Sequence, residues 1–498
     1  MLFNSIEFLI FFPIVLIIYY IIPDRIKYLW LLAASYYFYM CWNAKYALLL
    51  LTSTAITYIS GLLIEKIKQS DYISRKKESM KKWVVAGSFI LNLGILFYFK
   101  YFNFAVNTLS SILAKFSIEL NIPEFDIILP VGISFFTFQA LSYTMDVYRD
   151  EIYAEKNFFR YALFVSFFPQ LVAGPIERSK NLLKQLAVPK KFNFEEARDG
   201  FMIMLWGYFL KLVLADRIAV FVDTVYGDYK SYTGCYLIVA TMLFAVQIYC
   251  DFAGYSTIAV GAAKFLGIQL MENFDAPYIS VSVAEFWRRW HISLTSWFKD
   301  YLYIPLGGSR KGKARKYLNK LIVFLVSGLW HGASFSFVVW GGLNGLYQII
   351  GEVLMPLRNR AVSILHLNRD SFGHKFASIV GTFILVDFSW IFFRADRLKE
   401  ALAIIKSMYT VRNPWILFDG SLYTCGLDEK NFRFMLVAIA ILIGVDICKR
   451  HGIVIRKVIL GQDYWFRWVF IALSIAFLLT FGIWGPNYNG ANFIYFQF

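Results

Sequence analysis

Charged residues are scarce in this sequence: Asp, Glu, Lys and Arg make up 17% of the 498 residues, while 58% are hydrophobic. A soluble chain of this length usually divides into several domains joined by polar linkers, and we find no low-complexity linker and no internal repeat. Apolar blocks long enough to cross a bilayer recur along the whole chain instead. The composition therefore predicts one all-helical, polytopic membrane domain over residues 1–498.

Cysteine is also scarce, with five residues and no C-x-x-C pair. This spacing indicates neither a disulfide framework nor a zinc or iron–sulfur site, and we expect no bound metal. The chain also lacks a G-x-S-x-G elbow, a Walker loop, a D-x-D pair and an H-E-x-x-H motif. These absences exclude the common serine hydrolases, nucleotide hydrolases, metal-dependent sugar transferases and zinc proteases.

Acidic residues are fewer than basic ones, 34 against 50, and the formal net charge is +16. The basic residues fall mainly between apolar blocks, as the positive-inside rule predicts for a membrane protein, so we expect no nucleic-acid partner. The densest tracts are a predicted loop at 65–82 and the stretch 308–320, which we expect to be cytoplasmic. The N-terminus is then outside, and the first apolar block reads as a retained span and not as a signal peptide.

The apolar blocks predict thirteen spans. We place these spans at 4–22, 27–42, 45–64, 83–104, 126–147, 201–222, 233–250, 252–270, 321–339, 340–356, 376–393, 432–448 and 465–485. The segment 157–180 is apolar but broken by proline and glycine, so we expect a re-entrant or half-buried element that other protein segments cover.

A further amphipathic helix is predicted over 283–299, after a capping box formed by Ser282 and Glu285. Its apolar stripe includes Trp287 and Trp290, whereas Arg288 and Arg289 lie off the stripe. We expect this helix to lie along the membrane or against its cytoplasmic side. His291 falls on the stripe and is expected to be buried. From spacing alone, a hydrogen bond to a neighbouring backbone carbonyl is a better account of this histidine than a catalytic role.

His331 is the one ionisable residue in the apolar run 321–350. Eleven helical residues from Lys320 rise roughly 16 Å, about half of a hydrocarbon core of about 30 Å. An ionisable group at that depth is costly and normally faces a cavity, a partner or a pathway. A neutral imidazole there can act as a general base, or as a hydrogen-bonding link between helices.

Other residues of this region are candidates for weaker reasons. Asp251, in "CDFAGYS" (250–256), is a second ionisable residue whose burial in the membrane costs free energy. It can serve either as a proton partner or as a hydrogen-bond acceptor for a neighbouring helix. Small residues follow His331 around Trp340 and Asn344, and they leave room for close helix packing or for a narrow tunnel. The remaining histidines lie among charged residues and are expected to be solvated.

Several sequence blocks carry a resemblance to a known family. The string "EFWRRWHISLTSWFKDYLYIPLGGSRKG" precedes "SGLWHGASFSFVVWGGLNG", and further blocks match in order. These blocks are "PVGISFFTFQALSYTMDVYR" (130–149), "FFPQLVAGPIER" (167–178), "CDFAGYSTIAVGAAKFLGI" (250–268), "FFRADRLKEAL" (392–402) and "FIYFQF" (493–498). The chain resembles the membrane-bound O-acyltransferase family, in the bacterial branch that O-acetylates alginate, with its signature region at about 250–350.

The resemblance implies a ring of about 11 to 13 tilted transmembrane helices around a central tunnel, in the bacterial cytoplasmic membrane. It maps the catalytic histidine onto His331 and the second motif histidine onto His291. We expect the donor or substrate to contact Arg288, Arg289, Asp251, Tyr255, Trp340 and Asn344. The expected donor is acetyl-CoA, with no bound cofactor. The expected partners are membrane lipid, a polysaccharide acceptor and a separate extracytoplasmic acetyltransferase.

Two alternatives stay open. The chain also resembles the proteins that transfer D-alanine from a carrier protein to teichoic acid, although its length and its ending favour the acetyl branch. A transporter of an acylated intermediate would also suit broken helices and a polar group at mid-membrane, but the inverted repeats common in transporters are not visible.

Overall fold

The computed structural model describes residues 1–118, 129–483 and 494, and these residues form helices and no strand. This confirms the predicted all-helical fold. The helices group into two compact units. The first unit comprises Met1–Phe201 and Ala259–Met271, and the second comprises Met202–Ile258 and Glu272–Phe498. The single domain expected over 1–498 stays a prediction.

The first unit contains nine α-helices among its described residues, together with a 3₁₀-helix at Asp24–Ile26 and a π-helix at Phe97–Tyr101. The nine are α1 (Ile6–Ile21), α2 (Lys27–Met40), α3 (Ala44–Gln69), α4 (Ser74–Leu96), α5 (Phe102–Ala114), α6 (Ile133–Tyr148), α7 (Phe158–Ser166), α8 (Phe168–Leu171) and α9 (Ser179–Leu186). Two further α-helices have residues in both units, namely α10 (Phe194–Tyr208) and α12 (Cys235–Phe265).

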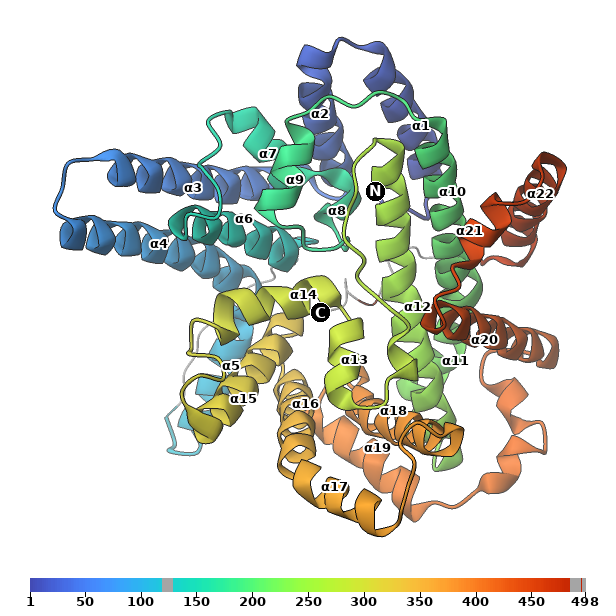
Figure 1. The fold of residues 1–498 in the computed structure, drawn as a ribbon. Helices are drawn as coiled ribbons and strands as arrows, with labels where there is room; N and C mark the ends of the chain where they lie inside the picture. Colours follow the sequence, from blue (N-terminus) through green and yellow to red (C-terminus); the bar gives the residue numbers. More distant parts are fainter. Residues whose placement is uncertain (119–128, 484–493, 495–498) are drawn as a thin grey trace. The chain divides into compact units, whose positions relative to one another are not determined.

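Helices α3 and α4 form a long antiparallel pair, and α6 packs against both (Figure 1). Almost every residue of α6 is buried, because most of its side chains are apolar or small and its buried Gln139 and Asp146 have hydrogen-bond partners. The basic tract 65–82 is not the loop that we predicted, since α3 and α4 extend into it and leave only residues 70–73 as the turn. Lys, Glu and Arg are good helix formers, so the tract continues both helices.

The segment 157–180 is broken and buried, as predicted. It forms the short helices α7 and α8, and residues 172–178 leave the helical path before α9 begins. At Gly174 a Cβ atom would stand 2.4 Å from the Cα of Gln170, so only glycine fits this turn. The part of the span predicted at 126–147 that precedes residue 129 lies outside the described residues, as does the ending 493–498 except for Ile494.

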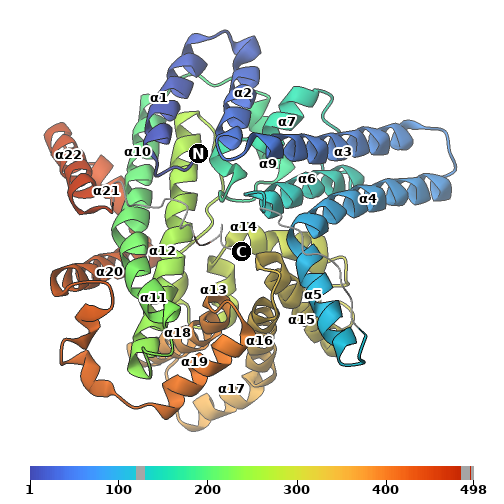
Figure 2. The same cartoon turned by 180° about the vertical axis from the view of Figure 1, so that it is seen from behind.

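The second unit holds the C-terminal helices, and Figure 2 shows them from behind. They are a π-helix at Phe209–Ala215, α11 (Asp216–Gly227), α13 (Val283–Arg289), α14 (Ile292–Phe298), α15 (Gly312–His331), α16 (Phe335–Val353), α17 (Met355–Ile364), α18 (Phe372–Arg394), α19 (Leu398–Thr410), α20 (Glu429–Arg450), α21 (Ile455–Leu460) and α22 (Tyr464–Phe481).

Helices α15 and α16 form a tight antiparallel hairpin. A Cβ atom on Gly328 would lie 2.2 Å from the carbonyl oxygen of Phe337, and one on Gly341 would lie 2.2 Å from that of Phe324. The two backbones therefore touch where the glycines face each other, which is how small residues bring membrane helices together.

Six helical stretches among the described residues are long and apolar enough to cross a bilayer, and α1 is a shorter apolar helix. The six are Ala44–Gln69, Ser74–Ala114, Cys235–Phe265, Phe372–Arg394, Glu429–Arg450 and Tyr464–Phe481. The chain is therefore a multi-pass membrane protein. The spans predicted at 233–250 and 252–270 are one helix, α12, because the charge of Asp251 is paired inside the protein and does not interrupt the helix.

Candidate active site

His331 is the last residue of α15, and its imidazole is buried among aromatic rings. The ring centroids of Trp330, Trp340 and Phe393 lie 5.0, 5.0 and 5.3 Å from that of the imidazole. These rings come from α15, α16 and α18, so three helices fix the orientation of one histidine.

The predicted span 321–339 is wrong because it is not one continuous helix. Helix α15 ends at His331, the backbone is extended at Gly332, and α16 begins after Ser334. The Ser334 hydroxyl caps α16 by accepting a hydrogen bond from the Ser336 N–H at 3.2 Å, a role for which serine is favoured. His331 therefore lies at the turn of a helical hairpin and not in mid-helix.

His291 lies between α13 and α14, so the single helix predicted over 283–299 is also wrong. The predicted cap is present, since the Ser282 hydroxyl accepts a hydrogen bond from the Glu285 N–H at 3.2 Å. However, the backbone of His291 is left-handed (φ 45°, ψ 54°). This conformation costs a residue with a Cβ atom about 1–3 kcal/mol, and such strain concentrates at functional sites. The predicted burial of His291 is confirmed, at 1% exposure.

The partner of His291 is an amide side chain and not the backbone carbonyl that spacing suggested. Its Nδ1 lies 3.1 Å from Asn273 Oδ1. The Ser293 N–H also donates to this Oδ1, at 3.2 Å, and a backbone N–H can only donate, so the atom is the amide oxygen. His291 Nδ1 must then carry the proton, which leaves the lone pair on Nε2.

The structure brings the two histidines together. Their ring centroids are 6.4 Å apart, although forty residues separate them in the sequence. The Phe252 ring packs edge-on against His291 at 4.6 Å.

Asn344 organises the surroundings of the pair. Its Oδ1 accepts a hydrogen bond from Trp287 Nε1 at 3.1 Å, and its Nδ2 donates to the Trp340 carbonyl at 2.9 Å and to the Ser389 hydroxyl at 3.2 Å. One fully buried amide thus links α13, α16 and α18.

Asp251 takes part in a buried cluster of charges. Lys211 Nζ lies 2.7 Å from Asp251 Oδ1 and 2.7 Å from Asp216 Oδ1, and the Ile494 N–H donates to Asp251 Oδ2 at 2.8 Å. These contacts fit the structural role that we considered for Asp251. Tyr255 is buried one turn further along α12. A role for either residue in substrate binding stays a prediction.

Sequence reasoning missed Lys211 and Asn273. A lysine inside the predicted apolar span 201–222 was a signal for Lys211, because such a residue needs an acidic partner. Asn273 lies in a stretch without periodicity, and no pattern indicated it. Among the described residues, no group of three or more His, Cys, Asp or Glu side chains is arranged to hold a metal ion.

Comparison with known proteins extends what the geometry shows. A model of the membrane-bound O-acyltransferase family matches residues 38–385. The chain is 36% identical to a probable alginate O-acetylase, AlgI, of Pseudomonas aeruginosa, over 82% of this chain and 75% of that protein. It is 33% identical to a peptidoglycan O-acetyltransferase of Helicobacter pylori, over 82% of this chain and 80% of that protein. The chain is 26% identical to a teichoic acid D-alanyltransferase of Bacillus subtilis, over 55% of this chain and 69% of that protein.

The chain belongs to the membrane-bound O-acyltransferase family. The resemblance drawn from its motifs is thereby confirmed, and the protein is a membrane-embedded acyltransferase. Both histidines lie inside the region that the family model matches. Their catalytic roles stay predictions that the geometry makes specific.

The two neighbouring arginines of this O-acyltransferase have different surroundings. Arg289 Nη1 lies 2.5 Å from Asp275 Oδ2, and its Nε lies 3.1 Å from Glu285 Oε1. Carboxylates of the protein therefore pair with Arg289, whereas the side chain of Arg288 is exposed. Contact of either arginine with an acyl donor stays a prediction.

Proposed function

We propose that this O-acyltransferase moves acetyl groups from a cytoplasmic thioester, acetyl-CoA, across the membrane for O-acetylation of a cell-surface or secreted polysaccharide such as alginate. The observation that carries the proposal is the buried pair of His331 and His291 in a family member. Support for acetyl and for a glycan comes from the names of the relatives in Pseudomonas and Helicobacter.

In the proposed reaction, His331 removes the proton of the accepting hydroxyl while the hydroxyl oxygen attacks the thioester carbonyl. The carbon–sulfur bond then breaks, and the proton passes from the imidazolium to the departing thiolate. Trp340 Nε1 is buried without a hydrogen-bond partner among the described residues. This N–H would stabilise the negative charge that develops on the carbonyl oxygen.

His291 would orient a reactant through its Nε2, because Asn273 holds the proton on Nδ1. The aromatic rings around both histidines exclude bulk water, which strengthens each polar interaction within the site. Arg288 would attract the phosphates of the donor. Water exclusion also limits hydrolysis of the thioester.

Two alternatives are weaker. Transfer of D-alanine has support from a more distant relative, which matches a smaller share of the chain. Transport without chemistry has no support among the relatives, whose names describe acyl transfer.

The test measures incorporation of labelled acetyl from acetyl-CoA by the purified protein, with a D-alanyl carrier protein as the competing donor. Replacing His331 with Ala should lower transfer by about 10²–10⁴-fold, the usual contribution of a general base. His451→Ala is the matched control, because this histidine is exposed at the end of α20. Near-normal transfer by His331→Ala would refute the role of His331, and use of the carrier protein alone would refute the acetyl donor.

A further inference from the structure

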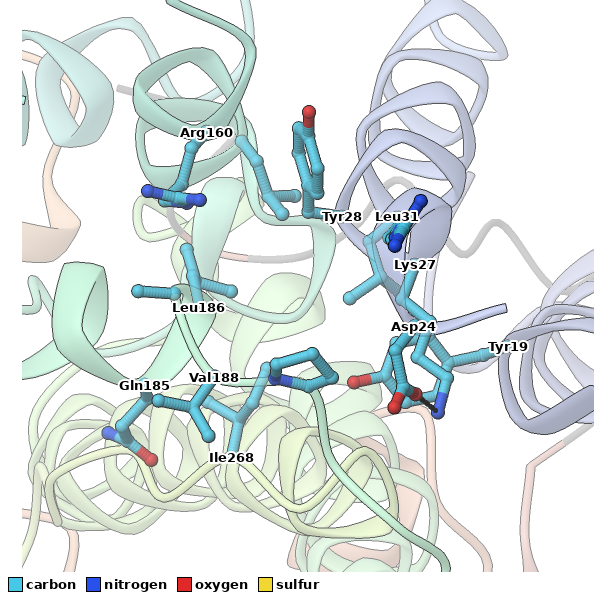
Figure 3. A pocket seen from close by; sticks show the side chains of 14 residues that line it. Tyr19, Asp24, Lys27, Tyr28, Leu31, Arg160, Gln185, Leu186, Val188 and Ile268 are labelled. Carbon is cyan, nitrogen blue, oxygen red and sulfur yellow. Dashed lines mark ion pairs between the residues drawn. The ribbon is translucent and has the colours of Figure 1, made fainter. Parts of the chain in front are cut away.

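A cavity of about 200 Å³ lies in the first unit, and none of its lining residues belongs to the histidine site (Figure 3). The α1–α2 turn, α7 and the stretch from α9 to Pro189 supply most of its wall. One part of the wall is apolar and includes Leu31, Leu163 and Ile268. The rest is cationic, with Arg25, Lys27 and Arg160 against one lining carboxylate, Asp24.

Lys27 is a buried charge in this wall, at 6% exposure. Its Nζ lies 2.7 Å from Asp24 Oδ1 and donates to the Lys190 carbonyl at 3.0 Å. The same ammonium lies 5.3 Å from the centroid of the Tyr19 ring. An ammonium has three N–H donors, and two of them meet these oxygen partners.

Arg160 stands on the other side of the cavity from Lys27 and Asp24 (Figure 3). Its guanidinium lies 5.7 Å from the centroid of the Tyr28 ring, and its Nη1 lies 3.4 Å from Glu155 Oε1. Its Nε is buried without a hydrogen-bond partner among the described residues. A buried N–H that lacks a partner is costly.

We propose that this cavity binds a phosphate group. Basic side chains on two sides of the cavity, one of them the planar guanidinium of Arg160, suit the oxygen atoms of a phosphate. The volume is below the roughly 300–1,000 Å³ of sites that enclose a drug-sized ligand, so it suits a small group and does not enclose a whole nucleotide. The group is either the phosphodiester of an anionic phospholipid, with its glycerol against the apolar wall, or free phosphate.

The experiment uses the full-length protein and two probes. In the first arm, the protein is placed in nanodiscs of phosphatidylcholine with and without phosphatidylglycerol, and the retained lipid is measured by native mass spectrometry. In the second arm, inorganic phosphate is titrated against the protein in a neutral detergent, with the thermal midpoint as the readout. Arg160→Gln removes the guanidinium group and its charge. Arg75→Gln is the matched control, because Arg75 is exposed at the start of α4 and outside the cavity.

We expect the wild type and Arg75→Gln to retain phosphatidylglycerol or to be stabilised by phosphate. Arg160→Gln should bind the probe to which the wild type responds about tenfold more weakly, because it loses a charge-assisted hydrogen bond. Arg160→Lys keeps the charge but removes the planar guanidinium. Its affinity for the probe should fall between those of the wild type and Arg160→Gln, and this variant shows whether a loss of binding reflects misfolding. A response confined to lipid identifies the phospholipid, and one confined to phosphate identifies the free ion. Equal binding by wild type and Arg160→Gln in both arms would overturn the proposal. Neither arm measures acetyl transfer, so the outcome is independent of the proposed function.

Discussion

At the scale of single residues, the two histidines are fixed by different means. Aromatic rings surround His331, whereas hydrogen bonds to Asn273 set the proton position of His291. Burial lowers the pKa of His291 to about 3. His291 therefore stays neutral across the range of about pH 5 to 8 in which histidines ordinarily titrate, and its Nε2 keeps a lone pair throughout.

This makes the pH dependence of an Asn273 variant predictable. In Asn273→Asp, a carboxylate beside Nδ1 favours the imidazolium and raises the pKa of His291. As the pH falls through the raised pKa, Nε2 gains a proton and loses its lone pair. The ratio of Asn273→Asp to wild-type acetyl transfer should therefore decrease toward acid pH. In Asn273→Ala the imidazole remains buried without a carboxylate, so transfer should be reduced by a factor that does not vary with pH.

Initial rates of labelled acetyl transfer from about pH 5 to 8 check this prediction. The Ala variant is the control, because it removes the same amide without adding charge. If both variants kept a pH-independent ratio to the wild type, the protonation state of His291 would have no part in the reaction.

At the scale of helices, the sequence predicts elements better than their ends. Apolar length was enough to predict α3, α18, α20 and α22. The break between α13 and α14 could not be predicted, because the apolar stripe keeps helical spacing through Trp290 and His291 while tertiary contacts hold the backbone left-handed. Pairing of Lys211 with Asp251, and of Asn273 with His291, depends on contacts between distant segments, which periodicity does not encode.

The α15–α16 hairpin gives a test at this scale. Replacing Gly341 with Ala forces a Cβ atom against the backbone of Phe324, and overpacking of this kind costs about 1–3 kcal/mol. Because the hairpin turn carries His331, we expect both the thermal midpoint in detergent and the transfer rate to fall.

Gly351 provides the matched control in the same helix. A Cβ atom there meets nothing within 4 Å, and alanine is favoured over glycine in a helix by about 1 kcal/mol. Gly351→Ala should therefore leave transfer unchanged and keep or raise the midpoint. Equal midpoints for the two variants would mean that the hairpin is not as closely packed as the structure describes.

At the scale of the whole molecule, the chemistry and the proposed phosphate site belong to different units. The histidine pair, Asn273 and Asn344 all lie in the second unit, and the cavity with Arg160 lies in the first. The segment 395–428, between α18 and α20, contains the amphipathic helix α19 and two short 3₁₀ turns, which leaves little room for a polysaccharide-binding groove.

We therefore predict that polysaccharide specificity resides in a separate extracytoplasmic acetyltransferase, and that this chain alone hydrolyses acetyl-CoA or passes on acetyl groups slowly and without selecting a sugar. The physical reason is that specificity for a polymer requires many contacts along it, while two histidines 6.4 Å apart select only the reacting group. The measurement reconstitutes the purified protein in vesicles with acetyl-CoA on the cytoplasmic side and candidate polysaccharides on the other. His331→Ala vesicles serve as the control for leakage and non-enzymatic transfer. Rapid acetylation of one polysaccharide over the others, with no second protein present, would show that these 498 residues choose the acceptor themselves.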